Sequence, residues 1–334
     1  MGQNKAMSKS TLLVQHIGIP GNYERPSSQL RNEDFQSFLQ LAEQNKIPLL
    51  FLQTVTCNRN IQPILSHYEE RYKNTLTLIT YTADLLEKIK VPYALFKTLK
   101  PFPYTPSDID VLLKSDESLP TVAETLKNRG CIPLEKDNYG LTMFSPKHKM
   151  NIDLTTQIAV SGLIYVNKKL LFDHLCKVEV NEVTVQTLKP EAELLVVAAH
   201  GVFKEQAYTL SDYYTFAMFT QYWKEATKLA ENFYLEHAFD MTLKMTKQVT
   251  ANSFGSTSAP MKKFVEAGVV NVLETRGEEY ELPKKYDSTF LMMAFLKKII
   301  EDPVSKQSLP CMARSVSNPA FYKRIVEHAT RKTY

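Results

Sequence analysis

The feature that most constrains this chain is a short apolar run that opens with two aspartates. Residues 107–113 read Ser-Asp-Ile-Asp-Val-Leu-Leu, with Asp108 and Asp110 ahead of the apolar end. An apolar run of this length is typical of a strand, in which residues two positions apart point to the same face. Two carboxylates held that close are costly unless a cation lies between them. The segment therefore predicts a cation site at the mouth of a buried strand.

A second acidic segment follows further along the chain, at residues 151–155. Here Ile152 and Leu154 are expected to face a core, so that Asp153 points the other way. If the two strands are neighbours, all three aspartates converge and offer the oxygen ligands that Mg²⁺ or Mn²⁺ prefers. The alternative is that the first aspartate caps a turn together with Ser107, while the other two lie on the surface.

Three carboxylates around Mg²⁺ indicate in-line transfer of a phosphoryl or nucleotidyl group. One metal ion neutralises the triphosphate and its leaving group, and a second lowers the pKa of the attacking hydroxyl. Asp153 can also accept the proton from that hydroxyl. The sequence therefore predicts Asp108, Asp110 and Asp153 as both metal ligands and catalytic residues, with a nucleoside triphosphate as substrate.

Hydrophobic periodicity places these segments in a sheet that is flanked by helices. A helix is expected from near Asn32, and a longer one over residues 61–90. A further helix should lie between the second and third of five strands, predicted at residues 91–96, 109–113, 131–134, 141–144 and 150–155. We therefore expect an α+β fold: a small mixed β-sheet domain at 91–189, between an N-terminal helical segment at 1–90 and a C-terminal helical domain at 190–334.

The last third of the sequence is mostly helical in pattern. A buried helix should begin at Pro190, and one long helix should run from Trp223 through Met245 and end before Gly255. Residues 252–286 are polar and irregular, which indicates a loop or a lid. Further helices are expected at 289–301 and 320–331.

Composition favours a soluble cytoplasmic protein. Of 334 residues, 44% are hydrophobic and 23% charged, and no apolar stretch approaches the ~20 residues that a membrane span requires. The four cysteines form no Cys-x-x-Cys pair, which is typical of a reducing compartment. The net charge of +4 suits a polyanionic ligand and leans mildly toward RNA.

The order of helix, strand, Asp-x-Asp strand, helix and later acidic strand resembles the DNA polymerase β-type nucleotidyltransferase fold. The closer resemblance is to the uncharacterised nucleotidyltransferase families of bacteria and archaea. In those families a hydrophobic strand ends in a Leu-Lys-Gly-like element, a position that Phe96, Lys97 and Thr98 take in this chain. The resemblance covers residues 35–215 and implies the three aspartates as its metal-binding catalytic residues.

The chain departs from that pattern where the superfamily presents a glycine turn whose N–H groups hold the triphosphate. Residues 98–106 contain three prolines and no glycine, and proline has no N–H to donate. The ammonium groups of Lys97 and Lys100 are candidates to replace that cradle, and the hydroxyls of Thr98 and Ser107 are weaker ones. Either lysine is alternatively a solvated loop residue.

His200 lies on a helix after the sheet and has a counterpart in the resembling families. We interpret it as a nucleotide contact or as a hydrogen-bonded core histidine. The leading function is transfer of a nucleoside monophosphate from an NTP to a hydroxyl of RNA or tRNA, a protein or a small molecule. The alternatives are a catalytically weakened nucleotide-binding or regulatory module, which the missing glycine favours, and an antitoxin-like partner in a two-protein system. The oligomeric state is left open.

Overall fold

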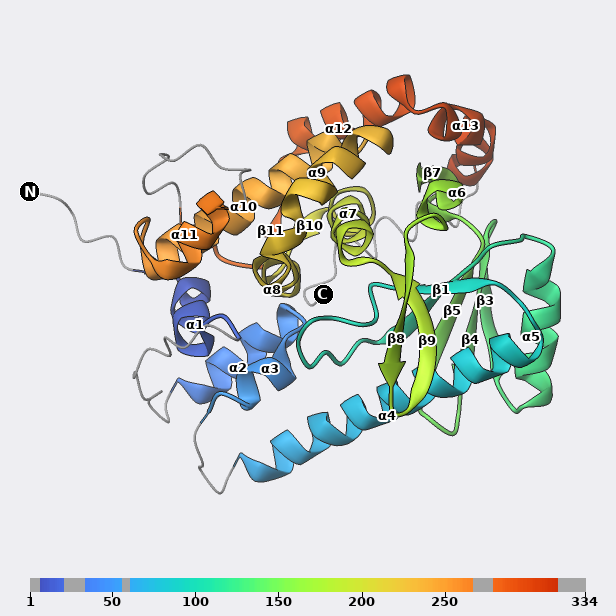
Figure 1. The fold of residues 1–334 in the computed structure, drawn as a ribbon, viewed down its shortest axis with the longest axis horizontal. Coiled ribbons are helices and arrows are strands. Elements are labelled where there is room, and N and C mark those ends of the chain that lie inside the picture. The colour runs from blue at the N-terminus through green and yellow to red at the C-terminus, as the bar shows by residue number, and fades with distance from the viewer. Residues whose placement is uncertain (1–6, 21–33, 56–60, 267–278, 318–334) are drawn as a thin grey trace, which may run out of the picture.

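The fold is built on one mixed sheet of seven strands, in the order β3-β4-β5-β2-β1-β9-β8. Its pairs β2–β5 and β1–β9 are parallel and its other neighbours are antiparallel. The computed structural model describes residues 7–20, 34–55, 61–266 and 279–317 (Figure 1). The strands of this sheet are β1 (Tyr93–Phe96), β2 (Asp108–Leu113), β3 (Ile132–Lys136), β4 (Gly140–Ser145), β5 (Met150–Thr155), β8 (Leu175–Val180) and β9 (Val183–Leu188).

Helices precede the sheet, cover it and continue after it. Figure 1 shows the N-terminal helices and the later helices gathered beside the sheet, while α4 runs along it. The helices are α1 (Lys9–Ile17), α2 (Phe35–Gln44), α3 (Pro48–Leu52), α4 (Gln62–Lys88), α5 (Ser118–Asn128), α6 (Lys168–Leu171), α7 (Pro190–His200), α8 (Leu210–Met218), α9 (Trp223–Asn232), α10 (Glu236–Phe254), α11 (Ala259–Glu266), α12 (Ser288–Glu301) and α13 (Pro303–Val316).

Shorter elements connect these helices. A π-helical turn, η1 (Gly201–Glu205), continues α7, and a 3₁₀ turn, η2 (Thr220–Tyr222), precedes α9. Two small antiparallel ribbons pair β6 (Ile158–Val160) with β7 (Leu163–Val166), and β10 (Ala207–Tyr208) with β11 (Lys284–Lys285). No helix in the described parts of the chain combines the length and apolar character needed to cross a membrane.

Alternate residues of β2 belong to two different surroundings. Ile109 and Val111 are fully buried in a core that α4 and α5 also line. On the opposite face Asp108 and Asp110 are only partly buried, and Leu112 joins the larger core of the helical region. This alternation follows from the two-residue period of a strand, and it leaves the aspartates at the polar end of an otherwise buried element.

The structure confirms the predicted α+β fold. The five predicted strands are β1 to β5, and the helices expected at 61–90, 190 onward and 289–301 are α4, α7 and α12. Strands β8 and β9, which were not predicted, extend the sheet beyond β1. The region 252–286, predicted as irregular, includes α11, and the unpredicted α13 follows α12 directly. The helix predicted at 320–331 lies outside the described residues.

The prediction of one long helix from Trp223 to Met245 is wrong, because the chain turns between α9 and α10. Tyr234 takes a left-handed backbone conformation with φ of 54°. Its N–H bonds the carbonyl of Glu231, and the N–H of Leu235 bonds the carbonyl of Ala230. This is the hydrogen-bond pattern that ends a helix, for which glycine is the usual left-handed residue. Tyrosine at that position hides the turn from a reading of the sequence.

Candidate active site

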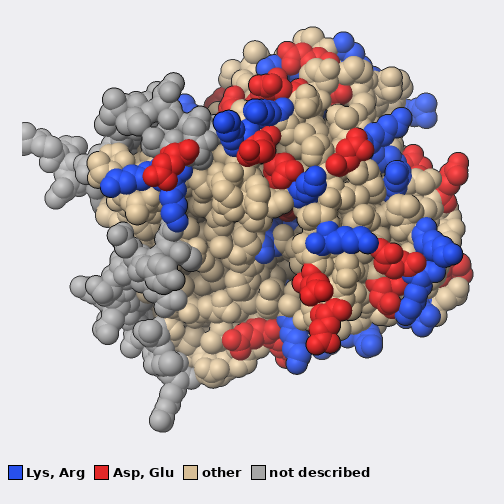
Figure 2. Space-filling view, viewed as in Figure 1, with Lys and Arg blue, Asp and Glu red and all other residues tan. Residues whose placement is uncertain are grey.

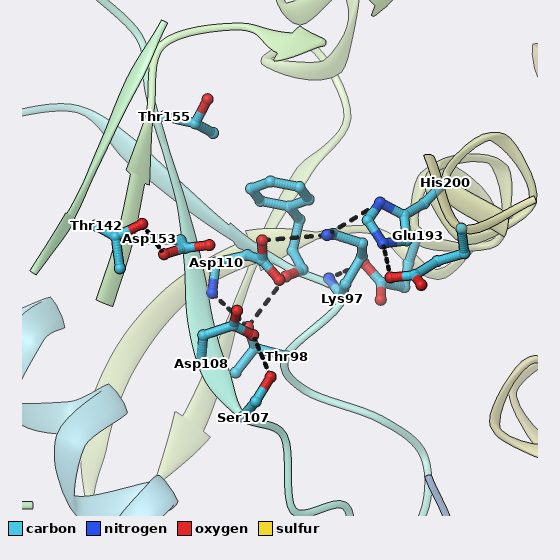
Figure 3. Close-up of polar contacts among 12 residues, drawn as sticks. Lys97, Thr98, Ser107, Asp108, Asp110, Thr142, Asp153, Thr155, Glu193 and His200 are labelled. Atoms are coloured by element: carbon cyan, nitrogen blue, oxygen red, sulfur yellow. Dashed lines mark hydrogen bonds and ion pairs between the residues drawn. The ribbon is translucent and has the colours of Figure 1, made fainter. Parts of the chain in front are cut away.

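The three aspartates lie on one face of the sheet, on adjacent parallel strands. Asp110 of β2 is directly opposite Asp153 of β5, and Asp108 is opposite Asn151. Residues opposite one another in register point to the same face, so the carboxylates of β2 and β5 share it. Figure 3 shows Asp153 beside Asp110, with Asp108 one step nearer the start of β2.

Hydroxyl groups fix this end of the sheet. Thr142 of β4 donates a hydrogen bond to Asp153 Oδ1 at 2.7 Å, and Ser107 donates to Asp108 Oδ1 at 3.2 Å. The buried Thr98 hydroxyl accepts from the backbone N–H of Asp110 at 2.9 Å. Thr98 therefore ties the loop after β1 to the acidic strand, which is a structural role.

A lysine already occupies one carboxylate of the group. Lys97 Nζ lies 3.1 Å from Asp110 Oδ1 and 3.3 Å from His200 Nδ1 (Figure 3). The backbone of Lys97 is left-handed, with φ of 57°, and its N–H donates to Glu193 Oε2 at 3.0 Å. The backbone bond to α7 holds Lys97 in a conformation that a non-glycine residue rarely adopts, and so directs its side chain along the sheet face.

The carboxylates differ in how they titrate. Burial, followed by the charges of Asp110 and Asp153, raises the pKa of Asp108 to about 6. Burial also raises the pKa of Asp153, although the Thr142 hydrogen bond opposes it. Burial works against ionisation of Asp110 as well, but Lys97 outweighs it and keeps the pKa of that carboxyl below its usual range. One aspartate is therefore neutralised by an internal cation and two are not.

His200 links Lys97 to the helical layer. Burial and the Lys97 ammonium lower the pKa of His200 to about 3, so its ring is neutral near pH 7. A neutral ring accepts at one nitrogen and donates at the other. Nδ1 faces the ammonium of Lys97, and Nε2 lies 3.1 Å from Glu205 Oε1, so Nε2–H is the donor to that carboxylate. Tyr165 OH is also 3.3 Å from Nδ1.

The π-helical turn η1 brings Glu205 to His200. The N–H of Gln206 bonds the carbonyl of Gly201, five residues earlier, which widens the turn at the end of α7. Glu205 is five residues after His200 and meets its ring, although residues this far apart diverge on a regular α-helix. Lys46 also lies 3.5 Å from Glu205 Oε1. No sequence pattern indicates this turn.

Lys100 enters a different environment. Its ammonium lies 3.6 Å from Glu193 Oε1. The side chain of Lys100 is 4% exposed and that of Glu193 is 6% exposed. Burial lowers the pKa of Lys100, and Glu193 and Asp212 only partly compensate. Asp212 also closes a capping box with Thr209 at the start of α8. Asp212 is therefore a first-turn residue of α8 with a capping role.

A cavity of about 490 Å³ opens between the sheet edge and the helices. That volume is within the range of small-molecule sites. Of the predicted site residues, the cavity wall includes Lys97, Lys100, Ser107, Asp108, Asp110 and His200. Thr98 and Asp153 are not part of that wall, although Asp153 adjoins Asp110.

Several charged residues of the cavity wall are not among those predicted from the sequence. They come from α2, α4, η1 and neighbouring turns, and they include Lys46, Arg71, Lys204 and Glu205. Arg71 of α4 donates to the Pro106 carbonyl at 3.0 Å, which holds the loop beside Asp108. In the sequence, Arg71 is one polar residue of the predicted helix at 61–90 and carries no further signal. Only the packing of α4 against the loop brings it to the site.

The donor chemistry fits a divalent cation, although the site is not a preformed metal cage. Across the described residues, no group of three or more His, Cys, Asp or Glu side chains is drawn together in the manner of a metal site. Carboxylate oxygens are nevertheless the ligands that Mg²⁺ and Mn²⁺ prefer, and a cationic nitrogen already lies against one of them. The arrangement accommodates positive charge at Asp110.

A mixed sheet with aspartates on two adjacent strands, beside a cavity lined by both acidic and basic side chains, is compatible with a nucleotidyltransferase-like protein. Residues 105–251 match the model of a family described as uncharacterised nucleotidyltransferase. This match supports a nucleotidyltransferase superfamily and, with it, nucleotidyl transfer in its general sense.

Comparison with individual proteins is less informative. No curated protein matches the sequence. Among solved structures, the chain is similar to an antigenic nucleotidyltransferase-like protein from Paracoccidioides brasiliensis, at 10% identity and a TM-score of 0.31. That likeness covers 72% of this chain and 93% of the other.

Proposed function

We propose that this protein transfers a nucleoside monophosphate from an NTP to a hydroxyl acceptor, with Mg²⁺ or Mn²⁺ held by Asp108, Asp110 and Asp153. The observation that supports this most is that Asp108 and Asp110 open into the same cavity as several cationic side chains. Carboxylates suit a divalent cation, and the cationic groups suit the phosphates that the cation would bridge.

The basic side chains of the cavity and the divalent cation have different proposed roles. Lys97, Lys100, Lys46, Arg71 and Lys204 provide positive charge for a triphosphate. When bound, the divalent cation supplies neutralisation of the triphosphate and activation of the acceptor hydroxyl.

Asp108 and Asp153 are the proposed proton acceptors, because neither has a lysine ion pair among the described contacts. Burial raises the pKa of both carboxyls, which brings them nearer to the range in which a general base is efficient. Ser107 and His200 orient neighbouring groups: Ser107 donates to Asp108, and His200 faces Lys97.

The acceptor is proposed only as a hydroxyl compound. The net charge of +4 leans toward RNA or tRNA, as the sequence already indicated. On the face shown in Figure 2, however, basic and acidic side chains are interspersed over the described residues, so this face offers no continuous basic track. Protein and small-molecule hydroxyls therefore remain alternatives in the test.

The test is incubation with each α-labelled NTP and Mg²⁺ or Mn²⁺, with bulk tRNA, whole-cell lysate or no acceptor. We expect label transfer that falls at least about 100-fold in Asp108→Ala and Asp110→Ala, since ion-mediated charge stabilisation is lost. Asp84→Ala is the matched control, because Asp84 is a half-exposed carboxylate of α4 paired with Lys88. Transfer that persists in both site variants would place the metal site elsewhere.

A nucleotide-binding module without turnover is the second candidate, and the loop after β1 favours it. Residues 98–106 contain three prolines. The N–H groups of Lys97 and Asp110, on either side of that loop, bond to Glu193 and Thr98 instead of facing the cavity. A phosphate therefore depends on side chains more than on backbone donors. Binding of NTP without transfer under every condition above would favour this module.

A further inference from the structure

Lys97 is held against Asp110 from several directions. Its ammonium contacts Asp110 Oδ1 at 3.1 Å and His200 Nδ1 at 3.3 Å, and it lies 5.0 Å from the centre of the Phe96 ring. The side chains of the ion pair are only 12% and 16% exposed. Glu193 fixes the left-handed backbone of Lys97 from the other side. A flexible lysine in solvent has none of these restraints.

His200 is itself held in the orientation that contacts Lys97. Its Nε2–H donates to Glu205, which leaves Nδ1 as an acceptor that faces the Lys97 ammonium and, at the same 3.3 Å, the Tyr165 hydroxyl. Glu205 reaches His200 because of the π-helical turn η1. Such turns are rare and are frequently found at functional sites. Glu205, His200, Lys97 and Asp110 therefore form one continuous polar chain from the helical layer to the sheet.

The ammonium and a divalent cation require the same oxygen. We propose that Lys97 is an internal counter-cation that occupies Asp110 in the metal-free protein and leaves it when a divalent cation binds, with His200 and Glu205 as positioning residues. Lys97 then remains in the cavity wall, where its charge is available to a triphosphate. This inference rests on the metal-dependent function proposed above, and it adds an exchange of cations at Asp110.

Lys204 provides the contrast that makes the proposal testable. It comes from the same π-helical turn, lines the same cavity and acts on the pKa of all three aspartates through space. Its side chain is exposed, and it has no ion pair among the described contacts. Removing Lys204 changes the charge near the aspartates without freeing an oxygen of Asp110.

The experiment measures Mn²⁺ binding to the nucleotide-free protein by electron paramagnetic resonance, at fixed pH and ionic strength. Lys97→Met is expected to bind Mn²⁺ at least about tenfold more tightly than the wild type, because the competing ammonium is gone. Lys204→Met is expected to change affinity by less than about threefold, because solvent screens an exposed charge. Equal gains in the two variants would show general electrostatics and overturn the exchange.

Variants of the positioning residues test the chain without removing the lysine. Glu205→Ala is expected to raise Mn²⁺ affinity about threefold, because His200 no longer holds the ammonium in place. Glu205→Gln keeps an acceptor for Nε2–H and should restore the wild-type affinity. Identical affinities for the Ala and Gln variants would remove Glu205 and His200 from the proposal.

The two proposals fail in different ways. If the wild type binds Mn²⁺ and Lys97→Met matches Lys204→Met, the exchange at Asp110 is wrong and the metal-dependent function stands. If no variant binds Mn²⁺, with or without the lysine, the metal site itself is wrong and both proposals fall. Circular dichroism of each variant shows that the comparison is made on folded protein.

Discussion

Lys97 and Lys100 leave the same loop three residues apart and enter opposite surroundings. Lys97 contacts an aspartate on the sheet face, and Lys100 contacts Glu193 of α7. Burial disfavours both ammonium groups, but Asp110, Tyr165 and Asp108 outweigh it at Lys97 and raise its pKa, whereas the pKa of Lys100 is lowered. The nearby negative charges therefore more than offset the effect of burial on the pKa of Lys97, whereas those near Lys100 do not.

The opposite pKa directions of the two lysines follow from the number of carboxylates near each ammonium. Glu193 serves both lysines, through the backbone N–H of Lys97 and the ammonium of Lys100. On the sheet face, Lys97 is the lysine in ion-pair contact with the aspartates among the described residues, and Asp108 and Asp153 have no such contact. Excess negative charge on a shared face is the condition under which an added cation is favourable. The loop therefore carries one lysine paired with Glu193 of α7 and one paired with Asp110 of β2.

The largest expected effect is a difference in metal rescue between the two lysines. Replacing either Lys97 or Lys100 with Met should lower the free energy of unfolding by about 3 kcal/mol in EDTA, because each leaves a buried carboxylate unpaired. Excess Mn²⁺ should restore most of that loss in Lys97→Met, since a ligand that binds the folded state stabilises it. It should not restore Lys100→Met. Urea denaturation with EDTA or MnCl₂ measures both.

The wild type is the control for that experiment, since any stabilisation by Mn²⁺ in it sets the baseline. Rescue of both variants to the same extent would mean that the loss at Lys100 is also repaired by charge at the aspartates. The distinction between the two lysines would then break down. No rescue of either variant would contradict a cation-binding role for Asp110.

The sequence predicted the acidic strands of the sheet better than the contacts that the helices make with Lys97 and Lys100. A strand pattern with period two places Asp108 and Asp110 on one face, whereas the convergence of Asp153 with them depends on β2 and β5 being neighbours in the observed parallel register. Lys97 and Lys100 were identified as cations of the loop, but their different partners depend on α7. That packing is a tertiary property.

The helical side could not be predicted, because its signals are absent or disguised. The π-helical turn η1 has no sequence signature, so the contact of Glu205 with His200 was not foreseen. Tyr234 replaces the glycine that usually marks a helix end. Strands β8 and β9 complete the sheet beyond β1, and their segments do alternate apolar and polar residues, so this hairpin was overlooked although its pattern is present in the sequence.

An effect of intermediate size is expected on the pH dependence of the free energy of unfolding, through the carboxylates that have no lysine ion pair. A group whose pKa is raised in the folded state destabilises the fold when it ionises, so Asp108 costs stability above pH 6 and nothing below its unfolded pKa of about 4. Asp108→Asn should therefore raise the free energy of unfolding by about 1–2 kcal/mol at pH 7.5 in EDTA. The gain should shrink as pH falls from 6 to about 4.

Urea denaturation at several pH values measures this gain, and Asp110→Asn is the informative counterpart. The pKa of Asp110 is lowered, so its carboxylate stabilises the fold at neutral pH, and that contribution is lost as pH falls through its folded pKa. The same substitution should therefore destabilise at position 110 and stabilise at position 108. A stabilising effect at both positions would show that Lys97 does not neutralise Asp110.

The smallest expected effect is at Lys46, the third lysine connected to the network. It lies 3.5 Å from Glu205, but its side chain is 32% exposed. An ion pair that solvent reaches contributes little, so Lys46→Met should change the free energy of unfolding by less than about 1 kcal/mol. Mn²⁺ affinity should stay within about twofold of the wild type, because His200 keeps its bond to Glu205. A loss as large as that in Lys97→Met would mean that the polar chain is anchored at Lys46, and that the separation of roles begins at the helical layer instead of at the loop.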